Sequence, residues 1–146
     1  MLSFKTIMDA FERQESHGLT ILYDQDFYYL RPDLVKYLDE VFDYEDITNN
    51  EKVLLTRVRQ ILKKKHYYLP SVNDFDEFKL ALDFLYTLDK KDYDYLNGMV
   101  HDHGSFRHFK EGCLHLGVYE IWLTYKKEKL ESFLTDWCDD KGINYL

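Results

Sequence analysis

The sequence predicts an α+β protein in which a small antiparallel sheet, made of a hairpin and a third strand, packs against a mainly helical C-terminal half. Residues 19–30 and 66–70 are rich in the β-branched and aromatic residues that favour strands. After Asn73, apolar residues recur at helical spacing almost to the end of the chain. Because the 146 residues include only 6 glycines, 2 prolines and no linker-like segment, we expect a single domain over residues 1–146, with residues 71–146 as its helical part.

A helix and a β-hairpin are expected first. Apolar residues recur at helical spacing from Phe4 to Phe11, Ser3 is placed to cap that helix, and Gly18 follows as a stop. In LTILYDQDFYYL, residues 19–30, two strand-prone runs flank the polar DQD. This pattern predicts a hairpin that bends at the three polar residues.

Two helices and the third strand follow. Pro32 suits the first turn of a helix, whose expected apolar residues are Leu34, Leu38, Val41 and Phe42. After the loop-like YEDITNN, a second helical stripe consists of Val53, Leu54, Val58, Ile61 and Leu62. The sequence HYYLP then predicts a strand that ends at Pro70 and gives the hairpin a partner.

The C-terminal half is predicted to consist of helices. Their apolar stripes are Phe75, Phe78, Leu82 and Leu85, then Tyr93, Leu96 and Val100, and then Phe106, Phe109 and Cys113, which are expected to start a buried face. The last helix carries the apolar residues Val118, Ile121, Trp122, Tyr125, Leu130, Phe133, Leu134 and Trp137. Breaks are predicted at His103-Gly104, where Ser105 can cap the next helix, at Gly117, and at Lys141-Gly142.

A motif pattern also runs through this half. The run G-x-F-R-x-F-K at residues 104–110 is followed by Trp122, by Asp136-Trp137 and by Gly142-Ile143, and Tyr67-Tyr68-Leu69-Pro70 precedes it. This order resembles an uncharacterised bacterial protein family of unknown function, whose members end in a G-x-F-R-x-F-K … W … W-L … G-I pattern. Cys138 stands where that pattern has a leucine. The resemblance covers about residues 66–143 and implies a small cytosolic protein of a bacterium or phage, but that family carries no assigned activity.

The chain is acidic, with a net charge of −8, which opposes a general nucleic-acid role because phosphate neutralisation supplies most of that affinity. Residues 51–65, EKVLLTRVRQILKKK, are an exception with six Lys and Arg against one acidic residue. They predict either a local basic strip or a helix whose dipole is complemented by Lys63 to Lys65 at its C-terminus. Nucleic-acid binding through Arg57, Arg59 and these lysines, or mimicry of nucleic acid by residues 1–50, stays an alternative.

Reactive-site motifs are lacking in the sequence. Cys113 and Cys138 have no C-x-x-C or metal-like spacing and fall on apolar helix faces, so we expect two free thiols in a reducing cytoplasm. No phosphate-binding glycine loop occurs. The opening MLSFKTIMDAFERQ is interrupted by charges and no long apolar run follows, so neither an export signal, a membrane span nor a membrane partner is expected. No cofactor is predicted.

Arg107 and Lys110 form the first candidate site. Residues three apart share a helix face, and Phe106 and Phe109 occupy an adjoining face. Free backbone N–H groups at the helix start and the two cations could together hold a phosphate, a nucleotide or a partner's carboxylates. Alternatively, Arg107 pairs with an acidic residue and joins one helix to another. A concave pocket that includes Trp122 would favour the first interpretation.

Histidines gather around the same run. His101, His103, His108 and His115 lie within 15 residues, together with Glu111. A helix could present some of them on one face, but zinc needs three or four converging ligands, and no H-E-x-x-H signature is present. No metal site is predicted. His103 and His108 are kept as candidate anion- or partner-binding residues beside Arg107 and Lys110.

The preferred hypothesis is a non-enzymatic protein-binding or regulatory module with an unknown protein partner. It depends on an acidic, tyrosine-rich composition, with 13 tyrosines, and on the lack of catalytic motifs. The tyrosines are expected to rim the core, although an aromatic partner surface would give the same composition. The alternative is a small enzyme or a nucleotide or anion binder centred on Arg107 and Lys110.

Overall fold

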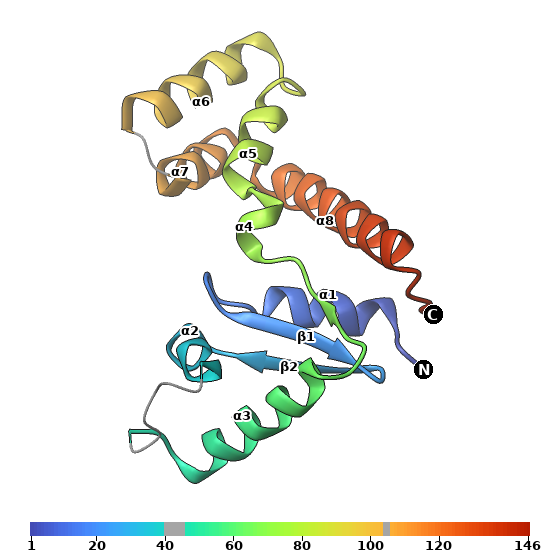
Figure 1. Cartoon of the computed structure of the whole chain (residues 1–146). Helices are drawn as coiled ribbons and strands as arrows, with labels where there is room; N and C mark the ends of the chain where they lie inside the picture. The colour runs from blue at the N-terminus through green and yellow to red at the C-terminus, as the bar shows by residue number, and fades with distance from the viewer. Residues whose placement is uncertain (40–45, 104–105) are drawn as a thin grey trace. The chain divides into compact units, whose positions relative to one another are not determined.

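The computed structural model describes residues 1–39, 46–103 and 106–146 (Figure 1). It confirms the α+β class, because a three-stranded antiparallel sheet lies in the N-terminal half and most helices lie in the C-terminal half. The chain divides into two compact units. We call them the sheet unit, Met1–Phe75 with Leu134–Leu146, and the helical unit, Asp76–Phe133. The single domain predicted over residues 1–146 stays a prediction.

The hairpin follows α1 (Phe4–Glu12), which begins as predicted: the Thr6 amide donates to the Ser3 hydroxyl at 3.1 Å. β1 (Leu19–Tyr23) and β2 (Asp26–Leu30) pair antiparallel, with Tyr23 opposite Asp26. The turn is therefore only Asp24-Gln25, and both residues have positive φ angles, 49° and 71°. Such two-residue turns match the twist of the flanking strands.

The predicted third strand is confirmed as β3 (Tyr67–Tyr68), which pairs antiparallel with β1 and gives the sheet order β2-β1-β3. In the register, Leu22 lies opposite Tyr67 and Ile21 opposite Tyr68. Because directly paired residues share a face, Leu22 and Tyr67 project from one side of the sheet, and Ile21 and Tyr68 from the other.

One face of the sheet is covered by helices that follow the hairpin in sequence. These are α2 (Pro32–Val35), the 3-10 helix η1 (Lys36–Leu38) and α3 (Asn49–Leu62). The buried residues of this layer are Ile21, Leu30, Leu34, Tyr37, Leu55, Val58 and Ile61. The predicted helical stripe lies in α3, but its first residue, Val53, is 69% exposed, and α3 turns Leu55 inward instead. Val41 and Phe42 lie outside the described residues.

α3 begins with a capping box. The Glu51 amide donates to the Thr48 hydroxyl at 3.2 Å, and the Thr48 amide donates to the Glu51 carboxylate at 2.8 Å. The bond from the Thr48 amide is the main cause that lowers the pKa of Glu51 below its ordinary value. This reciprocal pair fixes the first turn of α3, and with it the position of the basic residues that follow.

The two ends of the chain meet in the sheet unit. The Phe4 amide donates to the Leu146 carbonyl at 3.1 Å, and the Leu146 amide donates to the Leu2 carbonyl at 2.9 Å. The rings of Phe4 and Tyr145 lie 5.2 Å apart, centroid to centroid. The segment after α8 is therefore part of the sheet unit and not a loose tail.

The helical unit consists of α5 (Glu77–Leu85), α6 (Lys90–His103), α7 (Phe106–Leu116) and the first part of α8 (Tyr119–Lys141). The short α4 (Val72–Phe75) belongs to the sheet unit. The buried core of the helical unit consists of Ala81, Phe84, Leu85, Leu96, Val100, Phe109, Cys113, Val118 and Trp122. Gly117 and Gly142 follow α7 and α8 with φ angles of 72° and 68°, as the predicted helix ends require. The break at Gly104 and the cap at Ser105 lie outside the described residues.

Two apolar residues of the predicted helical stripes are exposed in this unit. Phe78 is 43% exposed and Ile121 is 57% exposed, although both fall on apolar stripes of their helices. Phe84 takes the buried position on α5, and Trp122 takes it on α8. Among the described residues, no helix combines the length and apolar character needed to cross a membrane.

Candidate functional site

Arg107 and Lys110 both lie on the exposed surface of α7. The Nε atom of Arg107 donates to Oε1 of Glu111 at 3.2 Å, four residues along the same helix, and the side chain of Arg107 is 84% exposed. The Nζ atom of Lys110 lies 5.6 Å from the centroid of the Tyr119 ring. Arg107 therefore makes a solvent-exposed pair within its own helix and does not join α7 to another helix through this contact.

The two phenylalanines of the same run form the inner side of α7. Phe109 is fully buried, and its ring lies edge-on to Trp122 at 5.0 Å and to Phe84 at 6.3 Å. Phe106 is half-buried, with its ring 5.5 Å from that of Phe109. The F-R-x-F-K run thus attaches α7 to the helical core through its rings and leaves its cations outside.

The remaining predicted site residues do not gather around the two cations. Trp122 is 2% exposed and belongs to the core, so its ring is not offered to a ligand. His108 is half-buried, and the side chain of His103 lies outside the described residues. The ring of His115 stacks on Tyr95 at 5.5 Å. Among the described residues, no three His, Cys, Asp or Glu side chains lie close enough to hold a metal ion.

The two cysteines are free and buried, Cys113 in α7 and Cys138 in α8. Burial raises the pKa of each thiol to about 11, and the charge of Asp139 adds to the shift at Cys138. Because the thiolate is the nucleophilic form, both groups are protonated and unreactive near neutral pH. Neither cysteine supports covalent catalysis.

A shallow groove lies between α5 and α8 in the helical unit. It has a volume of about 510 Å³ and is lined by Phe84, Thr87, Glu120, Ile121, Thr124, Tyr125 and Glu128. We call it the α5–α8 groove. Its floor is aromatic, since the rings of Phe84 and Tyr125 lie 5.2 Å apart. Phe84 is fixed from below by Phe109 and Trp122, so the floor is held by the core itself.

Ile121 is the exposed apolar residue of this groove, with 57% of its surface accessible. Glu120 and Glu128, both exposed, lie on α8 eight residues apart, which is about 12 Å along the helix axis. Thr124 lies between them. The arrangement is an apolar surface with a carboxylate toward each end, which suits a partner segment that is apolar in the middle and basic at its flanks.

The sequence did not reveal the groove, because Ile121 was identified only as one of the apolar residues of the last helix. One signal was available: Ile121, Trp122, Leu123 and Tyr125 together form a wide apolar arc on α8. A wide arc on a helix that packs on one side predicts that some of its apolar residues stay exposed.

Comparison of the chain with protein-family models, with curated proteins and with solved structures gives no match. The resemblance of residues 66–143 to an uncharacterised bacterial family therefore stays a prediction.

Proposed function

We propose that the protein is a non-enzymatic protein-binding module and that the α5–α8 groove takes a short helical segment of a partner protein. The observation that carries this proposal is an apolar groove with a preformed aromatic floor, an exposed isoleucine and a glutamate toward each end. Helix-in-groove recognition uses such surfaces, with apolar residues of the partner at positions i, i+3 or i+4, and i+7.

Burial of Ile121 is the main apolar contribution expected. Fully burying an isoleucine side chain is worth roughly 1.5–3 kcal/mol, and more than half of this side chain is exposed in the free protein. Covering it therefore contributes on the order of 1–1.5 kcal/mol, or about tenfold in affinity. The floor residues Phe84 and Tyr125 are already fixed, so little ordering entropy opposes docking.

Charge selects the partner. Glu120 and Glu128 favour Lys or Arg at both flanks of the docked segment, and they repel an acidic segment. The spacing of about 12 Å along α8 corresponds to about two turns of a partner helix. The proposed partner is thus a basic amphipathic helix with an apolar centre.

The alternative of an enzyme or anion binder at Arg107 and Lys110 has weaker support. Arg107 is engaged with Glu111, Lys110 lies against Tyr119, and Trp122 is buried in the core. The two protonated thiols also offer no nucleophile. We further propose a cytoplasmic location in a bacterium or phage-infected bacterium, supported by two free thiols that a reducing compartment preserves and by the resemblance noted above.

A display selection tests the proposal. A library of helical peptides with randomised surface positions would be selected on the wild-type protein and counter-selected on Ile121→Arg. We expect the enriched peptides to carry an apolar i, i+3/i+4, i+7 stripe with Lys or Arg at its flanks. Their affinity, measured by fluorescence anisotropy, should fall at least tenfold in Ile121→Arg.

Leu114→Arg is the matched control, because Leu114 is 56% exposed on α7 and does not line the groove. The selected peptides should bind this variant within twofold of wild type. Glu120→Lys/Glu128→Lys should reverse the preference toward acidic flanks. Peptides that bind Ile121→Arg as well as wild type, or a selection without enrichment, would contradict the proposal.

A further inference from the structure

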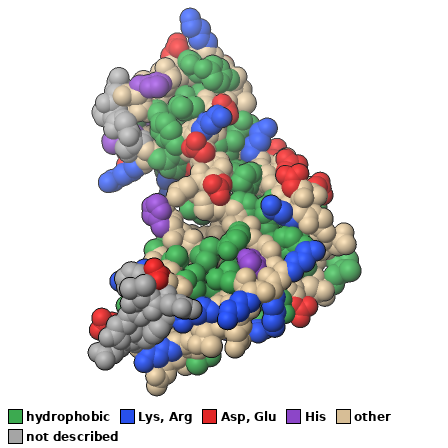
Figure 2. Space-filling model, in the orientation of Figure 1, with side chains coloured by type: hydrophobic (Ala, Val, Ile, Leu, Met, Phe, Trp, Pro, Cys, Tyr) green, Lys and Arg blue, Asp and Glu red, His purple; other side chains and the backbone are tan. Residues whose placement is uncertain are grey.

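Cations and tyrosine rings meet at the hairpin end of the sheet unit. Arg57 of α3 lies over two rings, 5.6 Å from the centroid of Tyr23 and 5.8 Å from that of Tyr28. Lys64 lies 5.5 Å from the Tyr23 ring, and Lys65 lies 5.9 Å from the Tyr67 ring. We call these six residues, Arg57, Lys64, Lys65, Tyr23, Tyr28 and Tyr67, the hairpin-end strip. Figure 2 shows a row of Lys and Arg side chains across the lower part of the molecule, where Figure 1 draws the hairpin and α3.

The cations of the strip are not neutralised by carboxylates of the described residues. No described Asp or Glu lies within salt-bridge distance of Arg57, Lys64 or Lys65. Cation–π contacts hold the three charges in place without cancelling them. Because the three cations lie close together beside the same rings, they form a local positive surface on a chain with a net charge of −8, and such a surface attracts anionic ligands.

The strip passes around the end of the sheet. Tyr23 and Tyr28 lie on the face that α3 covers, and Tyr67 lies on the opposite face with Leu22. The short segment after α3 therefore directs Lys64 to one face and Lys65 to the other. Tyr23 connects the hairpin-end strip to the pocket described next, because its ring contacts Arg57 and Lys64 and also lines that pocket.

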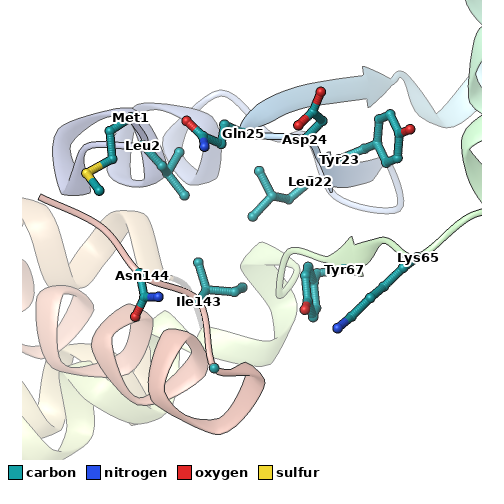
Figure 3. Close-up of a pocket in the computed structure, with 11 residues that line it drawn as sticks. Met1, Leu2, Leu22, Tyr23, Asp24, Gln25, Lys65, Tyr67, Ile143 and Asn144 are labelled. Carbon is teal, nitrogen blue, oxygen red and sulfur yellow. The ribbon is translucent and has the colours of Figure 1, made fainter.

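A pocket of about 330 Å³ opens where the strip reaches the second face (Figure 3). Leu2, Leu22 and Ile143 form its apolar wall, and Lys65 and Tyr67 stand together on one side. Its full lining is Met1, Leu2, Leu22, Tyr23, Asp24, Gln25, Lys65, Tyr67, Gly142, Ile143 and Asn144. Apolar walls with a few polar groups at this volume are typical of sites for small ligands.

We infer that the hairpin-end strip and this pocket bind single-stranded nucleic acid. Phosphates lie along Arg57, Lys64 and Lys65, and one unstacked base enters the pocket against Tyr67 and the wall of Leu22 and Ile143. A groove of cations that tracks the backbone, combined with aromatic side chains that stack with bases, is how proteins hold single strands without strict sequence preference. The inference concerns the sheet unit and does not depend on the α5–α8 groove.

The pocket favours a single strand over other polyanions. Bases of a duplex are paired and stacked, so none is free to enter a recess beside Tyr67. An acidic peptide or an anionic bilayer would use the cations but would leave the pocket unexplained. The overall charge does not oppose the inference, because exposed charges further than the Debye length of about 8 Å from the strip are largely screened at physiological salt.

The direct test is fluorescence anisotropy of the full chain with labelled 12-nucleotide oligothymidylate and oligouridylate at several salt concentrations. Three phosphate contacts predict a slope of log affinity against log salt of about −2, because each contact contributes about −0.7 for a single strand. Affinity should therefore fall about tenfold when salt rises from about 50 to about 150 mM. Equal affinity for both strands means that the protein contacts only phosphates and bases. A preference for oligouridylate means that it also contacts the 2′-hydroxyl.

Lys64→Glu/Lys65→Glu should abolish most of this binding and reduce the slope to about −0.7, with Arg57 as the remaining contact. Lys90→Glu/Lys91→Glu is the matched control, since these two consecutive lysines are also exposed but lie in the helical unit. It should bind as wild type does. Tyr67→Leu should lower affinity about tenfold through loss of stacking, and Asp24→Asn should raise affinity by removing a carboxylate from the pocket rim.

Three results would overturn the inference. The first is no binding of either strand even at about 20 mM salt, where phosphate contacts are strongest. The second is binding that survives in Lys64→Glu/Lys65→Glu or is lost equally in Lys90→Glu/Lys91→Glu. The third is polyglutamate of matched charge, duplex DNA or vesicles of anionic lipid binding within twofold of the single strands, since the base would then have no part in recognition.

Discussion

Substitution of Phe109 by alanine tests whether the rings of α7 stabilise the core while its cations lie on the surface. The ring of Phe109 is fully buried and contacts three others, those of Trp122 at 5.0 Å, Phe106 at 5.5 Å and Phe84 at 6.3 Å. Removing it leaves a cavity among rings that are themselves packed and cannot collapse freely. Phenylalanine-to-alanine changes in such cores cost about 3–5 kcal/mol, and we expect a loss of that size.

Arg107→Ala is the companion variant on the same helix. Its pair with Glu111 is exposed on both sides, with 84% and 52% of the side chains accessible. Exposed pairs four residues apart on a helix contribute about 0.3–0.5 kcal/mol, so Arg107→Ala should change the free energy of unfolding by no more than that. The loss in free energy of unfolding is thus expected to be at least about six times larger for Phe109→Ala than for Arg107→Ala.

The assay is urea unfolding followed by far-UV circular dichroism and by tryptophan fluorescence, which reports on the two buried tryptophans, Trp122 and Trp137. The dependence of the free energy on urea should be unchanged, so that shifts of the midpoint report stability. Phe109→Leu keeps most of the apolar volume and should cost about 1 kcal/mol, which preserves the test if the alanine variant does not fold. A loss below about 1 kcal/mol for Phe109→Ala, or above about 1.5 kcal/mol for Arg107→Ala, would refute the assignment of the rings to the core and of the arginine to the surface.

Three further predictions concern local features. Thr48→Ala should lower the free energy of unfolding by about 1 kcal/mol, measured by urea unfolding, because α3 loses its N-cap, and an unchanged midpoint would contradict the capping role. The folded-state pKa of Glu51 lies below its unfolded value, so its stabilisation is complete above about pH 4.5 and is lost as the pH falls through the folded pKa. The difference in urea midpoint between wild type and Glu51→Gln should therefore shrink between pH 6 and pH 3. Cys113 and Cys138, with thiol pKa values near 11, should react with iodoacetamide at pH 7.5 only after unfolding, as mass spectrometry can follow; rapid labelling of the native protein would show that they are not buried.

Elements whose signals are local could be predicted from the sequence. Ser3 caps α1 through a bond to an amide three residues away, and Gly117 adopts the left-handed backbone that ends α7. The hairpin and the strand at Tyr67–Tyr68 followed from β-branched and aromatic runs bounded by turn residues. Helical spacing also identified Phe109 as an inward residue. In each case the sequence signal lies within a few residues, even where the contact that it serves, such as the pairing of β3 with β1, joins distant segments.

The α5–α8 groove and the aromatic part of the hairpin-end strip could not be predicted, because they depend on residues far apart in sequence. Only the cations Arg57, Lys64 and Lys65 of that strip were named from the sequence. Periodicity shows which side of a helix is apolar, but not how much of that side a neighbouring helix covers. Val53, Phe78 and Ile121 belong to predicted apolar stripes and are nevertheless exposed. Likewise, Arg57 and Tyr23 are separated by 34 positions and meet only through the packing of α3 on the sheet. Their contact turns an apparent helix-end charge run into part of a surface with aromatic rings.

Amide chemical-shift mapping by NMR tests the central claim, that the α5–α8 groove is the partner-binding surface, most directly. A peptide from the display selection would be titrated into ¹⁵N-labelled protein. We expect the largest amide chemical-shift changes at Thr87, Ile121, Thr124 and Glu128, and no change in the amide shifts around Leu114. Shifts centred on the outer face of α7 instead, or an unchanged spectrum around Ile121 at saturation, would contradict it.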